Sequence, residues 1–210
     1  MYKKPYSQQK EARQQNISLL LQDLWRHSPL SKSMLAQRNG LTKATISSIC
    51  RDLAAQGLIC NAGQDRTGFG RPGDLIELNP SARCSIGAEI STNYVAAVLT
   101  DLCGQPLWQR TASIEIGSAQ EIVLAQAESL ISEAIDQARV RAFPLLGIGV
   151  GVPGVVNHRV NAPTLGWKEV PLKQIWEQKY DLPVIVENKA RAGAVAEVLH
   201  GSARDATSFI

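Results

Sequence analysis

Residues 31–59 carry the pattern of two short helices joined by a tight turn, and this pattern constrains the fold more than any other feature of the chain. Ser31 is a residue type that caps the start of a helix, and Gly40 supplies the positive φ at which a helix ends. Thr42 then predicts the start of a second helix, and Gly57 predicts its end. The segment therefore predicts a helix-turn-helix followed by an extended strand, as in a winged helix.

The second predicted helix separates its apolar residues from its polar ones. Its apolar positions fall at helical spacing and would face inward: Ile46, Ile49, Cys50 and Leu53. Small hydroxyl groups and cations remain outside, where they can approach base edges and phosphates without steric conflict. We therefore predict that double-stranded DNA is contacted by Thr42, Lys43, Thr45, Ser47, Ser48 and Arg51. The alternative is an ordinary helical hairpin with a solvated polar face.

Charge is distributed unevenly along the chain. Residues 1–73 hold 11 lysines and arginines against 4 acidic residues, a net charge of +7, whereas residues 74–210 hold 11 against 15, a net charge of −4. Binding to DNA gains free energy from released counterions wherever lysine and arginine meet the phosphate backbone. The basic first third therefore favours the DNA-binding interpretation over the solvated hairpin.

Length and composition indicate two domains and give no sign of a membrane-spanning segment. With 210 residues, of which 44% are hydrophobic and 20% charged, the chain fits one small and one medium domain. No apolar run approaches the roughly 20 residues that span a bilayer, and the N-terminus lacks the apolar stretch of a signal peptide, so we expect a cytoplasmic protein. The cysteines show no metal-ligand spacing. We expect no bound metal and reduced, mostly buried thiols at Cys50, Cys60, Cys84 and Cys103.

Two further segments complete the expected N-terminal domain, residues 1–73. A helix from about Asn16 to His27 would pack against the helical pair and complete a three-helix core. Residues 61–79 are rich in glycine and predict a wing hairpin, in which Arg66 and Arg71 would meet DNA phosphates. A flexible interdomain linker is the alternative interpretation of the same segment.

Residues 74–210 alternate between strand and helix patterns and predict an α/β domain. The expected elements are strands within residues 84–116, a helix from about Ser118 to Arg141, a buried strand at 145–154, a helix from Leu172 to Tyr180, a strand at 183–188, a helix from Ala190 to Leu199 and the start of a strand at Ser208. A core strand without a continuation leaves backbone groups unsatisfied. We therefore expect either a truncated domain or a core completed by oligomerisation.

Four motifs in this order resemble the ROK family (repressors, open reading frames and kinases), and within it the xylose-type repressors. They are GFGRPGDLIELNP at 68–80, GIGVGVPGVV at 147–156, NAPTLGW at 161–167 and LPVIVENKARAGAVAEVLHG at 182–201. The resemblance implies an N-terminal winged helix-turn-helix followed by the first part of an actin-like (RNase H-like) sugar-kinase-type domain, assembled as a dimer or tetramer. It further implies a repressor of sugar-utilisation genes, whose monosaccharide effector alters the spacing of paired DNA-binding heads on an operator.

The chain departs from the kinase members of this family at two places. Those kinases have an Asp-x-Gly-Gly-Thr loop, whose glycines let backbone amides close on ATP phosphates, whereas residues 89–93 read EISTN here. The kinases also use an Asn-Asp pair whose aspartate is the general base, and this chain has Asn188-Lys189. An ammonium group takes no proton at neutral pH unless burial strongly depresses its pKa. We expect no ATP cofactor and no phosphoryl transfer.

The same resemblance places the candidate effector site at Gly154, Thr164, Asn188 and Lys189. The family usually has asparagine at the position of Thr164, and its later Glu-x-Gly-His sugar contacts and Cys-rich zinc loop would lie beyond residue 210. The site either binds a monosaccharide or is a structural relic that serves dimerisation, and Trp167 is either a platform for the sugar or a core residue. Two alternatives for the whole chain are a sugar kinase with an added N-terminal module and a decayed DNA-binding fragment without an effector.

Overall fold

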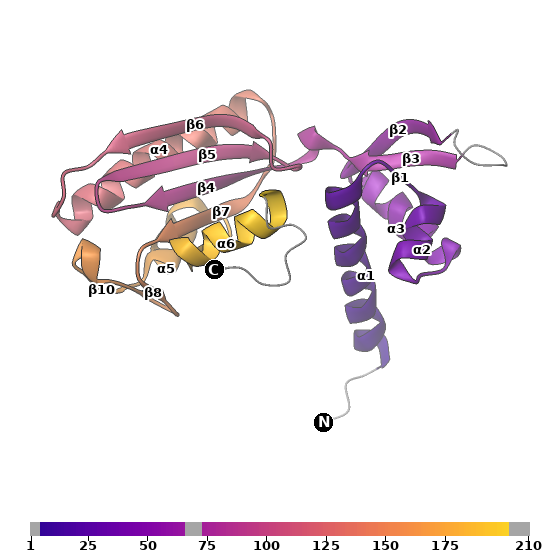
Figure 1. Ribbon diagram of the computed structural model, residues 1–210, viewed down its shortest axis with the longest axis horizontal. Helices are drawn as coiled ribbons and strands as arrows, with labels where there is room; N and C mark the ends of the chain where they lie inside the picture. The colour runs from indigo at the N-terminus through magenta and orange to yellow at the C-terminus, as the bar shows by residue number, and fades with distance from the viewer. Residues whose placement is uncertain (1–4, 66–72, 202–210) are drawn as a thin grey trace. The chain divides into compact units, whose positions relative to one another are not determined.

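The structure, a computed structural model, describes residues 5–65 and 73–201. The chain divides into two compact units, residues 1–82 and residues 83–210, which are described separately (Figure 1). The domain boundary expected after residue 73 lies N-terminal to the division in the structure, which follows residue 82. The reason is that residues 73–78 form a strand of the first unit's own sheet.

The first unit combines helices with a small sheet. Its described elements are α1 (Pro5–His27), β1 (Leu30–Ser31), α2 (Lys32–Asn39), α3 (Lys43–Ala55), β2 (Ile59–Asp65), β3 (Gly73–Leu78) and the 3-10 turn η1 (Pro80–Ala82). The sheet has the order β1-β3-β2, and both pairings are antiparallel. The predicted helix-turn-helix with a following strand is confirmed. The first helix begins at Pro5 rather than near Asn16.

The turn between α2 and α3 is held by the residues that the sequence indicated. Ser31 Oγ accepts a hydrogen bond from the backbone N–H of Met34 at 3.3 Å and caps α2. Gly40 ends that helix with φ +63°, a conformation that costs glycine little. Thr42 Oγ1 caps α3 by accepting from the N–H of Thr45 at 3.1 Å. The predicted caps are thus confirmed.

The core of the first unit is shared by its helices and β3. Leu20 and Leu24 of α1, Leu35 of α2 and Ile46 and Ile49 of α3 have no exposed surface. Cys50 and Leu53, on the same face of α3, are also buried. Burying each such aliphatic side chain contributes about 1.5–3 kcal/mol. The expected three-helix core and the inward face of α3 are therefore confirmed.

The second unit is built on a five-stranded sheet of order β11-β7-β4-β5-β6. Its main elements are β4 (Cys84–Ile90), β5 (Tyr94–Asp101), β6 (Pro106–Ser113), α4 (Gln120–Val140), β7 (Leu145–Val152), α5 (Leu172–Tyr180), β11 (Val184–Asn188) and α6 (Lys189–His200). Strands β4, β5 and β6 are antiparallel neighbours, whereas β7 runs parallel to both β4 and β11. A small antiparallel sheet is formed by β8 (Val155–Val156), β9 (Val160–Ala162) and β10 (Trp167–Val170), with the turn η2 (Pro163–Leu165) between the last two. The predicted α/β domain is confirmed.

Helices cover the two faces of the large sheet differently. Helices α4 and α5 lie on one face and α6 on the other, against β7 and β11 (Figure 1). Trp176 of α5 has no exposed surface and donates its indole N–H to Glu128 of α4 at 3.1 Å. The bulky residues of β7, Ile148, Val150 and Val152, are buried in the core of the second unit, and glycines alternate with them along the strand. A Cβ at Gly147 would lie 2.6 Å from the carbonyl oxygen of Pro183, so the chain leading into β11 approaches too closely for any other residue.

Some expectations fall outside the described residues. Arg66, Arg71 and the strand expected to begin at Ser208 are among them. Within the described part of the chain, none of the helices combines the length and the apolar character that a membrane crossing requires. All four cysteines are free thiols, with Cys50 and Cys84 buried and Cys60 and Cys103 half-buried.

Candidate functional site

The candidate DNA-contacting residues of α3 lie on the side of the helix that faces away from the core. Thr42, Lys43 and Arg51 are exposed, and Thr45, Ser47 and Ser48 are half-buried. Two of these hydroxyls also hold the helix start, because Thr42 Oγ1 caps α3 and lies 2.9 Å from Thr45 Oγ1. Lys43 and Arg51 form no ion pair with other described residues. The two cations therefore remain available to a partner.

Arg13 of α1 is a further residue of this surface. Its guanidinium forms an ion pair with Asp52 of α3 and donates a hydrogen bond to Ser48 Oγ at 3.5 Å. Asp52 is the acidic residue of α3, and a free carboxylate there would repel DNA phosphates. Arg13 neutralises it. No pattern in the sequence indicated this contact, since the residues before Asn16 lack an apolar periodicity.

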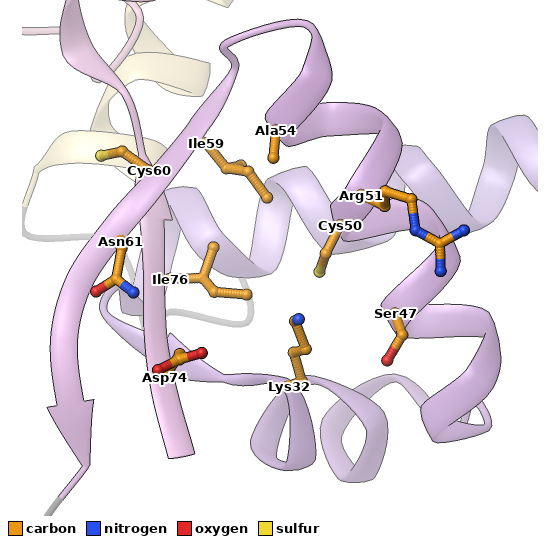
Figure 2. Close-up of a pocket in the computed structure, with 10 residues that line it drawn as sticks. All are labelled: Lys32, Ser47, Cys50, Arg51, Ala54, Ile59, Cys60, Asn61, Asp74 and Ile76. Atoms are coloured by element: carbon orange, nitrogen blue, oxygen red, sulfur yellow. The ribbon is translucent and has the colours of Figure 1, made fainter. Parts of the chain in front are cut away.

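The segment predicted as a wing forms a hairpin on both sides of its undescribed tip. Strands β2 and β3 pair from Ile59 and Leu78 to Asp65 and Gly73. A flexible linker would not form such a paired ladder, which carries a register shift between Asn61 and Gly63, so the wing interpretation is confirmed for these strands. Between α3 and the wing strands lies a hollow of about 390 Å³ (Figure 2). Arg51 and Ser47 line it from the side of α3.

In the second unit, two of the candidate effector residues are joined directly. Asn188 Nδ2 donates to the carbonyl oxygen of Gly154 at 2.6 Å, while its Oδ1 accepts from the N–H groups of Ala190 and Arg191 at 2.9 and 3.1 Å. Asn188 therefore caps α6 and ties it to the turn after β7. Gly154 has φ +122°, and a Cβ there would lie 2.2 Å from the carbonyl oxygen of Asn161. Only glycine fits this place.

Lys189, which the resemblance places at the position of the kinases' general base, contacts side chains from β4, from the loop after it and from β5. Its Nζ lies 2.8 Å from Glu89 Oε1, 3.4 Å from Ser91 Oγ and 5.7 Å from the centroid of the Tyr94 ring. Tyr94 also donates its hydroxyl hydrogen to Glu89 at 2.5 Å. The loop after β4 and the start of α6 are thus joined by one polar cluster, defined here as the Glu89–Lys189 cluster.

The contacts of this cluster favour the protonated form of Lys189 at neutral pH. Hydrogen bonding to Glu89 raises the pKa of Lys189, and the charge of Glu89 acts in the same direction. Burial raises the pKa of Glu89, but hydrogen bonds from Lys189 and Tyr94 outweigh burial and hold the pKa below its ordinary value. Both groups are therefore charged at pH 7. The depressed lysine pKa that proton abstraction would require is the opposite of what the contacts produce.

Comparison with known proteins identifies the family. Residues 85–210 match the ROK family. The chain belongs to the ROK family. The xylose repressor of Bacillus spizizenii is 31% identical to it over 198 residues, which are 93% of this ROK chain and 51% of that repressor. The chain spans about half the length of the curated relatives it matches.

A solved structure and a kinase complete the comparison. The crystal structure of a ROK family transcriptional regulator, a homolog of the Escherichia coli MLC protein, superposes with a TM-score of 0.73 at 25% identity and covers 90% of this ROK chain and 49% of that protein. The glucokinase of Streptomyces coelicolor is 31% identical over 124 residues, 57% of this chain and 37% of the enzyme. The repressor and regulator matches extend over both units, whereas the glucokinase match covers little more than half of the chain.

The remaining candidate residues of this ROK chain differ in their surroundings. Thr164 is exposed on η2, and no hydrogen bond among the described residues joins it to Gly154, Asn188 or Lys189. Trp167 is only 3% exposed and belongs to the core of the second unit, so the core interpretation is confirmed over the sugar platform. The structure thus links Gly154 to Asn188 and its neighbour Lys189, whereas no hydrogen bond among the described residues ties Thr164 to them.

We expect Lys189→Asp to lower the free energy of unfolding of this ROK chain by about 0.5–2 kcal/mol at pH 7. The substitution removes an ion pair of half-exposed groups and places a second carboxylate beside Glu89. Because the pKa of Glu89 is lowered and that of Lys189 raised, the pair stabilises the fold between these values. The loss should therefore shrink as the pH falls below the ordinary glutamate pKa of 4.5.

Urea unfolding at a series of pH values, followed by tryptophan fluorescence, measures this difference. Lys168→Asp is the matched control, because Lys168 is exposed on β10 and has no ion pair with other described residues. Equal losses in the two variants, or a loss independent of pH, would contradict a stabilising Glu89–Lys189 cluster.

Proposed function

We propose that this chain is the DNA-binding part of a transcriptional repressor of sugar-utilisation genes, which binds its operator as a homo-oligomer in the cytoplasm and responds to a monosaccharide. The observation that carries the proposal is α3 itself. Its outer face presents Lys43 and Arg51 unpaired among the described residues, its one acidic residue is neutralised by Arg13, and a β-hairpin follows it. This arrangement suits a helix that enters the major groove of DNA.

The family matches support the same proposal. The xylose repressor relative covers both units of the chain, and so does the solved transcriptional regulator. In this proposal the second unit contributes to effector response and oligomerisation. Gly154, Thr164, Asn188 and Lys189 remain the candidate effector residues, with Thr164 and Lys189 keeping exposed polar surface for a ligand, whereas the amide of Asn188 is used within the fold.

We further propose that the chain is not an enzyme, although a glucokinase is among its relatives. The group at the place of the general base is a protonated lysine held by Glu89. The loop that would approach ATP phosphates has no glycine between residues 89 and 93 and is tied to Lys189 through Ser91. A coupled ADP-release assay with glucose, xylose, mannose and N-acetylglucosamine should show no turnover above a blank without protein.

A binding selection tests the repressor proposal. Duplexes enriched from a random library by the purified protein should bind at least about 10³-fold more tightly than unselected duplex at the same salt concentration, as measured by fluorescence anisotropy. Each of the same four monosaccharides is then added singly. At least one of them should change the affinity of the protein for the selected duplex. Failure to enrich any sequence would reject the repressor. Enrichment without a sugar response would favour the fragment that binds DNA but senses nothing.

A further inference from the structure

The hollow between α3 and the wing strands combines an apolar floor with charged walls. Ile59 and Ile76 form part of its floor, and both are buried. Figure 2 shows Lys32 rising into it from the start of α2, with Arg51 on the wall formed by α3 and Asp74 on the wall formed by β3. Lys32 thus lies between Arg51 on the α3 wall and Asp74 on the β3 wall.

Lys32 is poorly placed for the stability of its own helix. It is the first residue of α2, where the unpaired backbone N–H groups already create a positive potential that favours anions. The first turn of α2 holds no acidic residue, and Lys32 forms no ion pair with any other described residue. A lysine in such a position lacks an internal partner for its charge. An external anion would supply one.

A second observation places the ammonium group within the hollow. The charge of Lys32 acts on the thiol of Cys50, although burial dominates there and raises the pKa of that thiol. Cys50 lines the same hollow from α3. Figure 2 shows the Lys32 side chain extending toward Cys50 of α3 rather than away from the protein.

We propose that this hollow seats one sugar-phosphate strand of DNA, with Lys32 on a phosphate and the apolar floor against deoxyribose. The inference rests on the proposed DNA-binding function and adds a contact from α2. A helix in the major groove and a hairpin in the neighbouring minor groove are separated by one backbone strand, and the hollow lies between those two elements. Asp74 repels phosphate from the wing side, so charge complementarity places the phosphate on the side of Lys32 and Arg51.

The salt dependence of binding tests this seat. With a duplex obtained by selection, Lys32→Ala should reduce the magnitude of the slope of log affinity against log salt by about 0.9, the value for one lost phosphate contact, and should do so equally on unselected DNA. Lys32→Arg should keep the slope. Asp74→Asn should raise affinity. Lys168→Ala, which removes the same charge from β10 of the second unit, is the matched control and should leave the slope unchanged.

A duplex with a single neutral methylphosphonate identifies the phosphate. At one position, this replacement should weaken binding of the wild type and abolish the further effect of Lys32→Ala, because the lysine then has no charge to meet. An unchanged slope for Lys32→Ala in a protein that binds DNA would overturn the phosphate seat and leave the repressor proposal standing. Absence of any DNA binding by the wild type would reject both. Circular dichroism verifies that the exposed substitution leaves the fold intact.

Discussion

Arg51→Ala is expected to weaken binding of selected DNA by about 1–3 kcal/mol if its guanidinium reads a base through two hydrogen bonds. Arg51 is exposed on α3 and is free of ion pairs with the described residues, so its loss removes no internal contact of that kind. Lys43→Ala, at the start of the same helix, is expected to weaken binding as well. Loss of a base contact relaxes selectivity at one position, whereas loss of a phosphate contact weakens all sequences alike.

Anisotropy titrations on a panel of single-base variants of the selected duplex separate these outcomes. Arg139→Ala serves as the control, since it removes an equally charged side chain that is exposed on α4 of the second unit. Its affinity for DNA should equal that of the wild type. If Arg51→Ala and Lys43→Ala both keep wild-type affinity, α3 does not contact DNA.

Gly154→Ala should produce the largest loss of stability, about 2–6 kcal/mol. The added Cβ would lie 2.2 Å from the carbonyl oxygen of Asn161 and 2.8 Å from the Cα of Ala162, and both neighbours are backbone atoms of β9 that cannot move aside alone. The φ of +122° adds backbone strain for any residue with a side chain. Relief of the clash would also displace the carbonyl that accepts the hydrogen bond from Asn188.

Substitution of a second glycine provides a control, because it is expected to raise the free energy of unfolding rather than lower it. Gly193 lies within α6, and nothing stands within 4 Å of a Cβ built there. Gly193→Ala should therefore raise the free energy of unfolding by about 0.5–1 kcal/mol, because alanine is the better helix former. Urea unfolding of the two variants measures both effects. A Gly154→Ala protein as stable as the wild type would show that the turn after β7 rearranges freely.

The sequence predicted the helix-turn-helix well because each of its determinants is local. The caps at Ser31 and Thr42 and the glycine at residue 40 act within a few positions, and the apolar spacing of α3 repeats within one helix. The start of α1 was missed, because its first turns are polar and are placed by Arg13 reaching a residue 39 positions later. The domain boundary was placed too early for a related reason. Strand β3 belongs to the first unit through its pairing with β1 and β2.

The candidate effector site shows the same limit. The sequence marked residues 89–93 and Lys189 as separate departures from the kinase motifs, without indicating that they meet. Their contact depends on strand register, since Glu89 of β4 lies beside Gly151 of β7, which in turn lies beside Glu187 at the end of β11. A Cβ at Gly151 would lie 3.4 Å from the Cβ of Lys189, so a glycine there leaves room for α6 to begin. Such packing across three strands is not encoded in any single motif.

In the ion pair of Glu89 with Lys189, at one corner of the sheet, the two opposite charges cancel. Glu187 and Arg191, one turn along, approach to 3.8 Å and balance one another in the same way. Fields that draw charged molecules from a distance require an excess of one sign, and these four side chains provide none. These four side chains would not attract a nucleotide or a sugar phosphate from a distance, and an anion that contacted Lys189 or Arg191 would compete with an internal counter-ion. If the proposed effector site lies at this corner, its recognition would depend on shape and on neutral hydrogen-bonding groups, as the recognition of an uncharged sugar does.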